Sequence, residues 1–368
     1  MPLRSARWIR IYVSEQIQKT MTKLLEDILH EPEELTKSLH QNWYHGRQRL
    51  EEAGHLVRDA RAVYIVGIGS SWHAGMAVLS IFHAFGCPAL LVDASEMVHF
   101  TLIPRESTVI ILSRSGRSIE VVQILEQMKS QQAKVIAVTN TMDSPLAEQA
   151  HVCLQLAARF DHLVSISMYS ALALVGSLIA AVAVGRLDEP LVRRLTDSLA
   201  STKETVALWQ EQIEATTWLN HNAPTYFLAR GGSLASCYEA RLLWEEAAKV
   251  PASSLSTGGF RHGPQEMVHE GLRVAIWLDG EKLRAEDMAL AMDLRRNGVR
   301  VFLIGQGVEH SAADLVINLP SIFPKWQFLI DIIPAQIAAE RLSRLRGVEC
   351  DTFRLCPYIV EHTGGLTA

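Results

Sequence analysis

The chain has few of the features that mark exported, membrane-bound or nucleic-acid-binding proteins. Its five cysteines are scattered and never stand in CxxC spacing, so neither a disulfide framework nor a zinc site is indicated. The most apolar segment, residues 171–184, is interrupted by Gly176 and Ser177 and is too short to cross a membrane. No apolar stretch with a small-residue cleavage site follows the basic N-terminus. No block of lysine and arginine stands out, and the net charge is −5. We therefore expect a cytoplasmic protein with free thiols that binds no metal, nucleic acid or membrane.

The chain does contain enough apolar material for two domains. Of its 368 residues, 48% are hydrophobic and 20% are charged, which suffices for two separate cores. From residue 62 onward, short strand-like apolar runs alternate with helical patterns, which predicts parallel sheets covered by helices on both faces. The two halves open alike, with "VYIVGIGSS" and "TYFLARGGS" each followed by a helical pattern. This similarity indicates a duplicated α/β domain.

Changes in pattern along the chain define the expected segments. They are an N-terminal arm (1–20), N-terminal helices (21–60), a first α/β domain (61–187), a helical connector (188–219), a second α/β domain (220–350) and a C-terminal tail (351–368). Met21 is an alternative start of the native chain, because helical periodicity begins there. Among the elements, we expect a strand over 88–95, a helix over 238–250 and a closing helix over 326–344.

Two hydroxyl-rich turns follow strands of the first half: "GIGSSWHAG" at residues 67–75 and "LSRSGRS" at residues 112–118. In an open parallel sheet, ligands bind beyond the carboxyl ends of the strands. Glycine lets the chain turn tightly, and the free N–H groups of the following helix attract an anion. One serine before a helix usually only caps it, but two such turns in one domain favour a phosphate site. Neither turn is a Walker A loop, because no lysine follows the glycines. Binding of NAD is the alternative, with only Asp93 placed to hold a ribose.

A second group of candidate residues lies in the other half. The helical stretch "SCYEARLLWEEAAKV" carries Glu239 and Glu246 two turns apart, and so on one face. The irregular stretch "PASSLSTGGFRHGPQEMV" then holds His262 before a Gly-Pro pair. A histidine in such a loop can act as an acid or base near neutral pH. Glutamates on helices are usually solvated, however, and the chain has 14 histidines, so neither signal identifies a site alone.

Five motifs in this order resemble a known family: "GIGSSWHAG", "LSRSGRS", "VTNTMDSPLAEQAH", "EARLLWEEAAKVPAS" and "GGFRHGPQEMV". They are similar to the paired sugar-isomerase (SIS) domains of glucosamine-6-phosphate synthase and its relatives. Those relatives include fructosamine-6-phosphate deglycases and amino-sugar phosphate isomerase/deaminases. The resemblance extends from about residue 21 to near the C-terminus. It implies two tandem SIS domains, each a flavodoxin-like three-layer sandwich with a parallel sheet.

The resemblance also implies roles for individual residues. Serines in the two turns fall on phosphate and sugar contacts of the family: Ser70, Ser71, Ser113, Ser115 and Ser118. Ser165, in "HLVSISMYSA", matches a serine or threonine position that faces the sugar. Glu246 falls on the catalytic glutamate, and His262 falls on the histidine that opens the sugar ring. In the family that histidine comes from the neighbouring subunit, so a homodimer with a shared site is implied, without any cofactor.

Departures from the synthase bear on the reaction. We expect no glutaminase domain with a terminal cysteine nucleophile. Leu243 stands where the synthase has a lysine one turn before the catalytic glutamate, and Arg114 replaces a glutamine in the second serine turn. The synthase also forms a Schiff base through a lysine in its C-terminal tail, whereas the last lysine here is Lys325. The resemblance therefore does not imply a complete synthase.

These features lead us to expect an enzyme that acts on a 6-phosphorylated amino sugar or glycated amine by enolisation. His262 would help to open the ring, and Glu246 would move a proton between C1 and C2. Two reaction classes stay open: isomerisation with deamination, and cleavage of a glycated amine. The alternatives are a simple aldose–ketose phosphate isomerase and a phosphosugar-sensing regulator without catalysis. Such regulators usually carry a DNA-binding helix-turn-helix, for which the first sixty residues are too acidic and poorly patterned.

Overall fold

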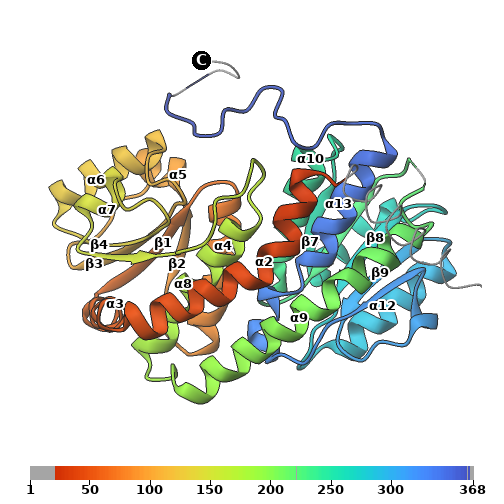
Figure 1. Cartoon of the computed structure of the whole chain (residues 1–368), viewed down its shortest axis with the longest axis horizontal. Coiled ribbons are helices and arrows are strands. Elements are labelled where there is room, and N and C mark those ends of the chain that lie inside the picture. The colour runs from red at the N-terminus through yellow and green to blue at the C-terminus, as the bar shows by residue number, and fades with distance from the viewer. Residues whose placement is uncertain (1–20, 221, 363, 365–368) are drawn as a thin grey trace, which may run out of the picture.

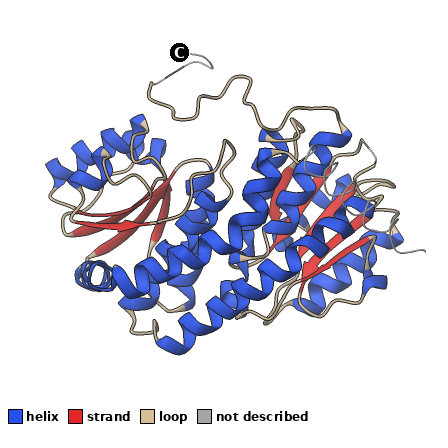
Figure 2. Ribbon diagram, viewed as in Figure 1, coloured by secondary structure: helices blue, strands red, loops and turns tan. Residues whose placement is uncertain are grey.

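The computed structural model describes residues 21–220, 222–362 and 364, so the expected N-terminal arm, residues 1–20, lies outside the described residues. Two α/β units lie side by side, with long helices running between and beneath them (Figure 1). Each unit is a sheet covered by helices, as Figure 2 shows by its colouring. The predicted α/β class is confirmed.

The first unit contains a parallel sheet with the strand order β2-β1-β3-β4-β5. Its strands are β1 (Ala62–Gly67), β2 (Leu90–Asp93), β3 (Ser107–Leu112), β4 (Lys134–Thr139) and β5 (Val152–Gln155). Its helices are α4 (Ser70–Ala84), α5 (Ala94–Phe100), α6 (Ile119–Gln131), α7 (Pro145–Gln149) and α8 (Ser167–Ala183). Alternate strand residues face opposite layers: Ile65 and Ile110 share a core with α4 and α8, whereas Val66 and Ile111 share one with α5 and α6.

The second unit repeats this topology with the order β10-β9-β8-β6-β7. Its strands are β6 (Thr225–Ala229), β7 (Ser253–Ser256), β8 (Arg273–Trp277), β9 (Arg300–Gly305) and β10 (Leu315–Asn318). Its helices are α10 (Ser233–Glu246), α11 (Thr257–Phe260), α12 (Arg284–Arg296) and α13 (Ile333–Leu345), with the 3₁₀ segments η2 (Pro264–Met267), η3 (His310–Ala312) and η4 (Pro324–Leu329). Both sheets place their first strand between the second and third, which is the flavodoxin-like order. The repeated topology agrees with the predicted duplication.

Helices outside the two sheets hold the units together. They are α2 (Lys23–His40), the π-helical segment η1 (Gln41–His45), α3 (Arg47–Asp59) and α9 (Glu189–Ala215). Helix α2 contacts α8 of the first unit, α13 of the second, and α9. Apolar side chains of α2, α4, α8, α10 and α13 belong to one continuous core. The two units therefore pack as one body, although each has its own sheet.

A carboxyl group is buried on the face of α2 that enters this core. The Glu31 side chain is fully buried and accepts a hydrogen bond from the Ser170 hydroxyl of α8, whereas its Oε2 has no hydrogen-bond partner. Burial raises the pKa of Glu31 to about 8, and the charges of Asp161 and Glu239 act in the same direction. Glu31 is therefore held mostly in its neutral form at pH 7.

Three expected elements differ from the structure. The expected strand over 88–95 ends at Asp93, whose carboxylate accepts the Ser95 N–H and so begins α5, a helix that the apolar pattern hid. The helix expected over 238–250 begins at Ser233 and ends at Glu246. The closing helix expected over 326–344 is divided into η4 and α13, and α13 begins with Pro334 in its first turn, where a missing N–H costs little.

No helix within the described ranges is both long and apolar enough to span a membrane. The most apolar helix, α8, is buried along nearly its whole length between the first sheet and α2, α3 and α4.

Candidate active site

A cavity of about 240 Å³ lies at the carboxyl ends of β1 and β3. These strands are neighbours in the sheet, but the chain leaves them toward opposite faces, so a crevice opens between the following loops. All serines predicted from the sequence line this cavity: Ser70, Ser71, Ser113, Ser115, Ser118 and Ser165. Glu246 also lines it, at the end of α10 from the second unit. The structure thus brings these residues together, while their contacts with a ligand stay predictions.

The first serine turn depends on two glycines. A side chain on Gly67 would meet the Ser71 backbone at 2.5 Å, so the chain can fold back here only without a Cβ. Gly69 has a φ of 57°, which favours glycine, and α4 begins directly after it at Ser70. The turn therefore holds Ser70 and Ser71 and the start of α4 against the cavity. The amino end of a helix is where an anion is best stabilised.

The second serine turn leaves its hydroxyl protons available. The Ser113 Oγ accepts the Gly116 N–H at 3.0 Å, and the Ser115 Oγ accepts the Arg117 N–H at 3.3 Å. Ser118 precedes α6 but does not cap it through its side chain. Because each hydroxyl carries one proton, both accepting serines can still donate to a ligand oxygen. This end of the cavity is therefore suited to a phosphate.

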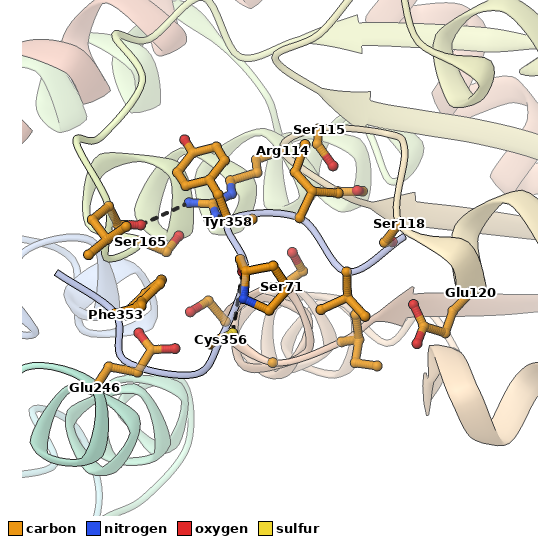
Figure 3. A pocket seen from close by; sticks show the side chains of 18 residues that line it. Ser71, Arg114, Ser115, Ser118, Glu120, Ser165, Glu246, Phe353, Cys356 and Tyr358 are labelled. Carbon is orange, nitrogen blue, oxygen red and sulfur yellow. Dashed lines mark hydrogen bonds between the residues drawn. The ribbon is translucent and has the colours of Figure 1, made fainter. Parts of the chain in front are cut away.

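Glu246 lies across the cavity from the second serine turn (Figure 3). Burial, together with the nearby charge of Glu239, raises the pKa of Glu246 to about 7 against the lowering effect of Arg114 and Lys249. Lys249 donates to the carbonyls of Glu246 and Thr352, which places a cation close to this carboxyl. A carboxyl with a pKa near 7 can both take up and return a proton at neutral pH.

Glu239 connects the two units at the edge of the cavity, a role that the sequence did not reveal. Its Oε1 accepts the Ser70 hydroxyl at 2.8 Å, and its Oε2 lies 2.7 Å from the His73 Nδ1. Both Glu239 and His73 are buried. Since the Ser70 proton is committed to Glu239, Ser70 presents only acceptor lone pairs to a ligand. Its hydrogen-bonding role is thus opposite to that of Ser113 and Ser115.

The C-terminal tail covers the cavity, which was also not foreseen. Tail residues that line it are Phe353, Cys356, Pro357, Tyr358, Ile359 and Val360. Arg114 donates to the Tyr358 carbonyl at 2.9 Å and stacks on its ring with 4.1 Å between Cζ and the centroid. The Ile119 N–H, at the start of α6, donates to the Val360 carbonyl at 3.1 Å. Figure 3 shows the tail passing between Glu246 and the second serine turn. Arg114 therefore holds the tail in place.

Ser165 reaches the cavity from the loop before α8. The buried Asp161 carboxylate accepts the N–H groups of Ile166, Ser167 and Met168 at 2.9–3.0 Å and so shapes this loop. Burial raises the pKa of Asp161 to about 6, against the effect of these backbone donors. The Tyr358 hydroxyl donates to the Asp161 carbonyl at 3.4 Å, which links the loop to the tail.

His262 does not line this cavity. It is exposed in the turn between α11 and η2, on the surface of the second unit. A role in this site therefore requires a second copy of the chain, as the resemblance implies, and both the role and the homodimer stay predictions.

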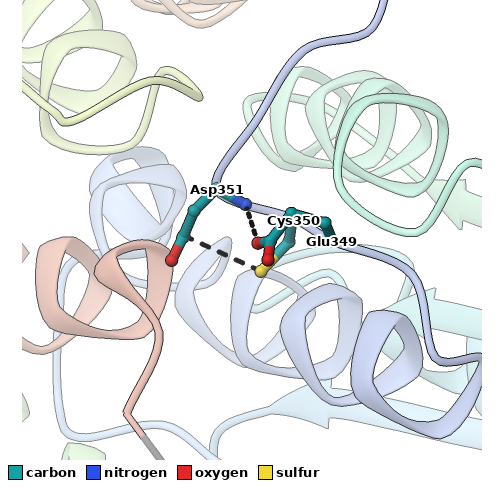
Figure 4. Close-up of side chains that lie close together, drawn as sticks. All are labelled: Glu349, Cys350 and Asp351. Atoms are coloured by element: carbon teal, nitrogen blue, oxygen red, sulfur yellow. Dashed lines mark hydrogen bonds between the residues drawn. The ribbon is translucent and has the colours of Figure 1, made fainter.

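One further group of potential metal ligands is present in the described part of the chain: Glu349, Cys350 and Asp351 (Figure 4). The Asp351 carboxylate accepts the N–H groups of Lys23 and Leu24, at 2.8 and 2.9 Å, and thereby caps α2. Glu349 accepts the Asp351 N–H at 2.8 Å. These contacts explain the group as a link between the tail and α2.

Residues 56–185 match the SIS domain family. Among curated proteins, the chain is 26% identical over 308 residues to the isomerizing glutamine–fructose-6-phosphate aminotransferase of Sulfurisphaera tokodaii, covering 82% of this chain and 50% of that protein. The chain thus spans about half the length of the curated relatives it matches.

Solved structures of proteins named for other reactions share the fold. Glucosamine-6-phosphate deaminase from Thermotoga maritima superposes with a TM-score of 0.77 at 20% identity, covering 92% of this chain and 99% of that one. Tagatose-6-phosphate ketose/aldose isomerase from Escherichia coli gives a TM-score of 0.78 at 21% identity, covering 91% and 97%. At these identities the likeness establishes the fold and not the reaction. Residues 56–185 are therefore similar to a SIS domain, and the chain with its repeated α/β unit resembles the isomerase half of the glutamine–fructose-6-phosphate aminotransferases.

Proposed function

We propose that the chain is an enzyme that enolises a 6-phosphorylated amino sugar or glycated amine and releases the amine. The proposal rests on the different chemistry of the side chains at the two ends of the cavity. Ser113 and Ser115 have hydroxyl protons to donate at one end, and Glu246, with a pKa of about 7, lies at the other. A phosphate bound at the serine turns would direct the carbon chain of the substrate toward Glu246.

The proposed reaction is a proton shift followed by hydrolysis. The Glu246 carboxylate takes a proton from the carbon that bears the amine, and the electron pair moves toward the neighbouring carbonyl, whose oxygen takes up a proton to give an enolamine. Glu246 then gives its proton to the former carbonyl carbon while the nitrogen loses one, which leaves an imine that water cleaves to a sugar phosphate and an amine or ammonia. Ser70 is an acceptor and suits a hydroxyl or amine donor of the substrate near this end. His262 of a second subunit would assist ring opening.

The side chains near Glu246 favour release of an amine over transfer of an amine to the sugar. The position of the synthase lysine holds Leu243, which is buried. Lys249 is engaged with two backbone carbonyls, and no lysine follows Lys325 in the sequence. A substrate that already carries nitrogen at C1 or C2 needs no lysine to form an imine. Glutamine should therefore not serve as a nitrogen donor.

The test incubates purified protein with glucosamine 6-phosphate and with glycated amine 6-phosphates, and follows ammonia, free amine and hexose phosphates. Amine release that is lost in Glu246→Gln supports the proposal. Interconversion of hexose phosphates without amine release from any substrate would establish the simple isomerase instead. Tight binding of phosphosugars without turnover would establish the sensing regulator. Glutamine-dependent formation of glucosamine 6-phosphate would refute the proposed direction.

A further inference from the structure

Three arginines meet at the amino ends of the strands in the second unit, away from the serine turns. Arg273 and Arg300 are the first residues of β8 and β9 and stand directly beside each other in register, so their side chains leave the same face of the sheet. Arg346 follows the last turn of α13 and is exposed. Arg346 donates to the Asn222 side chain and Arg273 donates to the carbonyl of the next residue, Ala223, which brings both guanidinium groups to the same stretch of chain. We call these three residues the arginine cluster.

Arg273 has unmet hydrogen-bonding capacity although it is only 1% exposed. Its Nη2 donates to the Ala223 carbonyl at 2.8 Å, and its guanidinium carbon lies 5.4 Å from the centre of the Trp218 ring. Its Nε and Nη1 are buried and have no hydrogen-bond partner. A buried charged donor without an acceptor is costly, so an arrangement of this kind calls for an anion or another acceptor.

The surrounding charges do not supply that anion. Arg300 pairs with Asp314 at 3.3 Å, and the same carboxylate accepts the Val301 N–H. Arg346 donates to the Asn222 side-chain oxygen at 3.3 Å, which is a neutral partner. Within the described ranges, neither Arg273 nor Arg346 forms an ion pair with a carboxylate. Burial, followed by the charge of Arg346, lowers the pKa of Arg273 to about 10, which reflects this lack of compensation.

We propose that the arginine cluster binds a doubly charged oxyanion, a phosphate group either free or as a monoester. Guanidinium groups present paired N–H donors that match the oxygens of phosphate. Asn222 and Arg346 are exposed, so an anion would reach the arginine cluster from solvent beside them. This site is separate from the serine turns and does not depend on the reaction proposed above.

The arginine cluster lies where the C-terminal tail begins. Directly after Arg346 the chain turns at Gly347, which has a φ of 64°, and then runs to Asp351 and on to Tyr358 over the cavity. The root of the tail, which backbone hydrogen bonds of Arg346, Gly347 and Val348 hold to α13, therefore lies beside the arginine cluster.

The experiment is a calorimetric titration with inorganic phosphate, and separately with glucose 6-phosphate, at constant ionic strength. The protein carries Ser113→Ala and Ser115→Ala, which weaken the serine turns, and the arginine variants are added to this background. Phosphate binding is expected to persist in the background and to weaken at least about tenfold in Arg346→Ala, because one charged hydrogen-bonding partner is lost. Arg296→Ala, an exposed arginine on α12 paired with Asp293, is the matched control and should leave binding unchanged. Binding of glucose 6-phosphate but not of inorganic phosphate identifies the ligand as an ester.

A second measurement tests whether Arg273 binds phosphate or has only a structural role. Arg273→Met keeps the apolar stem and removes the charge. Its melting temperature is expected to equal or exceed that of the background in phosphate-free buffer, and not to rise when phosphate is added. Loss of stability in phosphate-free buffer together with undiminished phosphate binding would mean that Arg273 only supports the Ala223 carbonyl. No binding in the background, or binding equal in Arg346→Ala, overturns the proposal regardless of the outcome for the reaction.

Discussion

Replacing Glu31 by glutamine tests whether the core between the two units holds a neutral carboxyl. The pKa of Glu31 is raised from 4.5 to about 8 in the folded chain. Between these values the folded state binds a proton that the unfolded state has released, so the free energy of unfolding falls as pH rises. This contribution is fully present below pH 4.5 and is lost as pH rises through 8. Glutamine cannot ionise, so Glu31→Gln removes this dependence.

The size of the effect follows from the slope of about 1.36 kcal/mol per pH unit for one proton. From pH 5 to pH 7, the native chain should lose about 2–3 kcal/mol of unfolding free energy relative to Glu31→Gln. The glutamine oxygen can still accept the Ser170 hydroxyl, so the variant is expected to fold.

The assay is urea unfolding of both proteins at pH 5, 6, 7 and 8. Glu33→Gln is the matched control, because Glu33 is partly exposed on the same helix and Lys203 holds its pKa below the usual value. The control should not reproduce the pH-dependent difference. A difference between Glu31→Gln and the native protein that stays constant from pH 5 to pH 8 would refute the neutral carboxyl.

Three further predictions concern the candidate active site. Ser113→Ala and Ser115→Ala should each weaken binding of a hexose 6-phosphate about tenfold or more, because each removes a donor to a charged group; equal affinity of the native protein for glucose and glucose 6-phosphate in titrations contradicts this. Glu239→Gln removes a negative charge that raises the pKa of Glu246, so the pH at which activity appears should move to lower values. An unchanged pH profile of kcat/KM would exclude an effect of Glu239 on the pKa of Glu246. Heterodimers of Glu246→Gln and His262→Ala chains should regain part of the activity that both parents lack, and no recovery after verified subunit exchange argues that both residues act within one chain.

The serine turns could be located from the sequence because they depend on local rules. Ser70 and Ser113 each follow a buried apolar strand, and adjacent parallel strands end at the same edge of a sheet. Glu246 could be placed near them only through the family resemblance, because it comes from the other unit.

The contacts that the sequence did not reveal join distant parts of the chain. Ser70 and Glu239 are separated by 169 positions, and their bond depends on how α4 packs against α10. The contact between Arg114 and Tyr358 spans 244 positions. Periodicity describes which face of an element is buried, but not which of many buried faces will meet. The helix predicted over 238–250 begins earlier in the structure, at Ser233. The glycines and serines before it gave no clear signal for its first residue.

The cap on α2 has a consequence for synthesis of the chain. The first residues of this helix are held by the carboxylate of Asp351, 328 positions later. At about 5–20 residues per second, a ribosome needs roughly 16–66 s to make the intervening chain. During that time the N–H groups of Lys23 and Leu24 lack this acceptor, and the apolar face of α2 lacks α13. The first α/β unit can fold meanwhile, but α2 cannot complete these contacts until Asp351 has left the ribosomal exit tunnel. Translational pauses before Asp351 is made would therefore leave α2 exposed to proteases and chaperones.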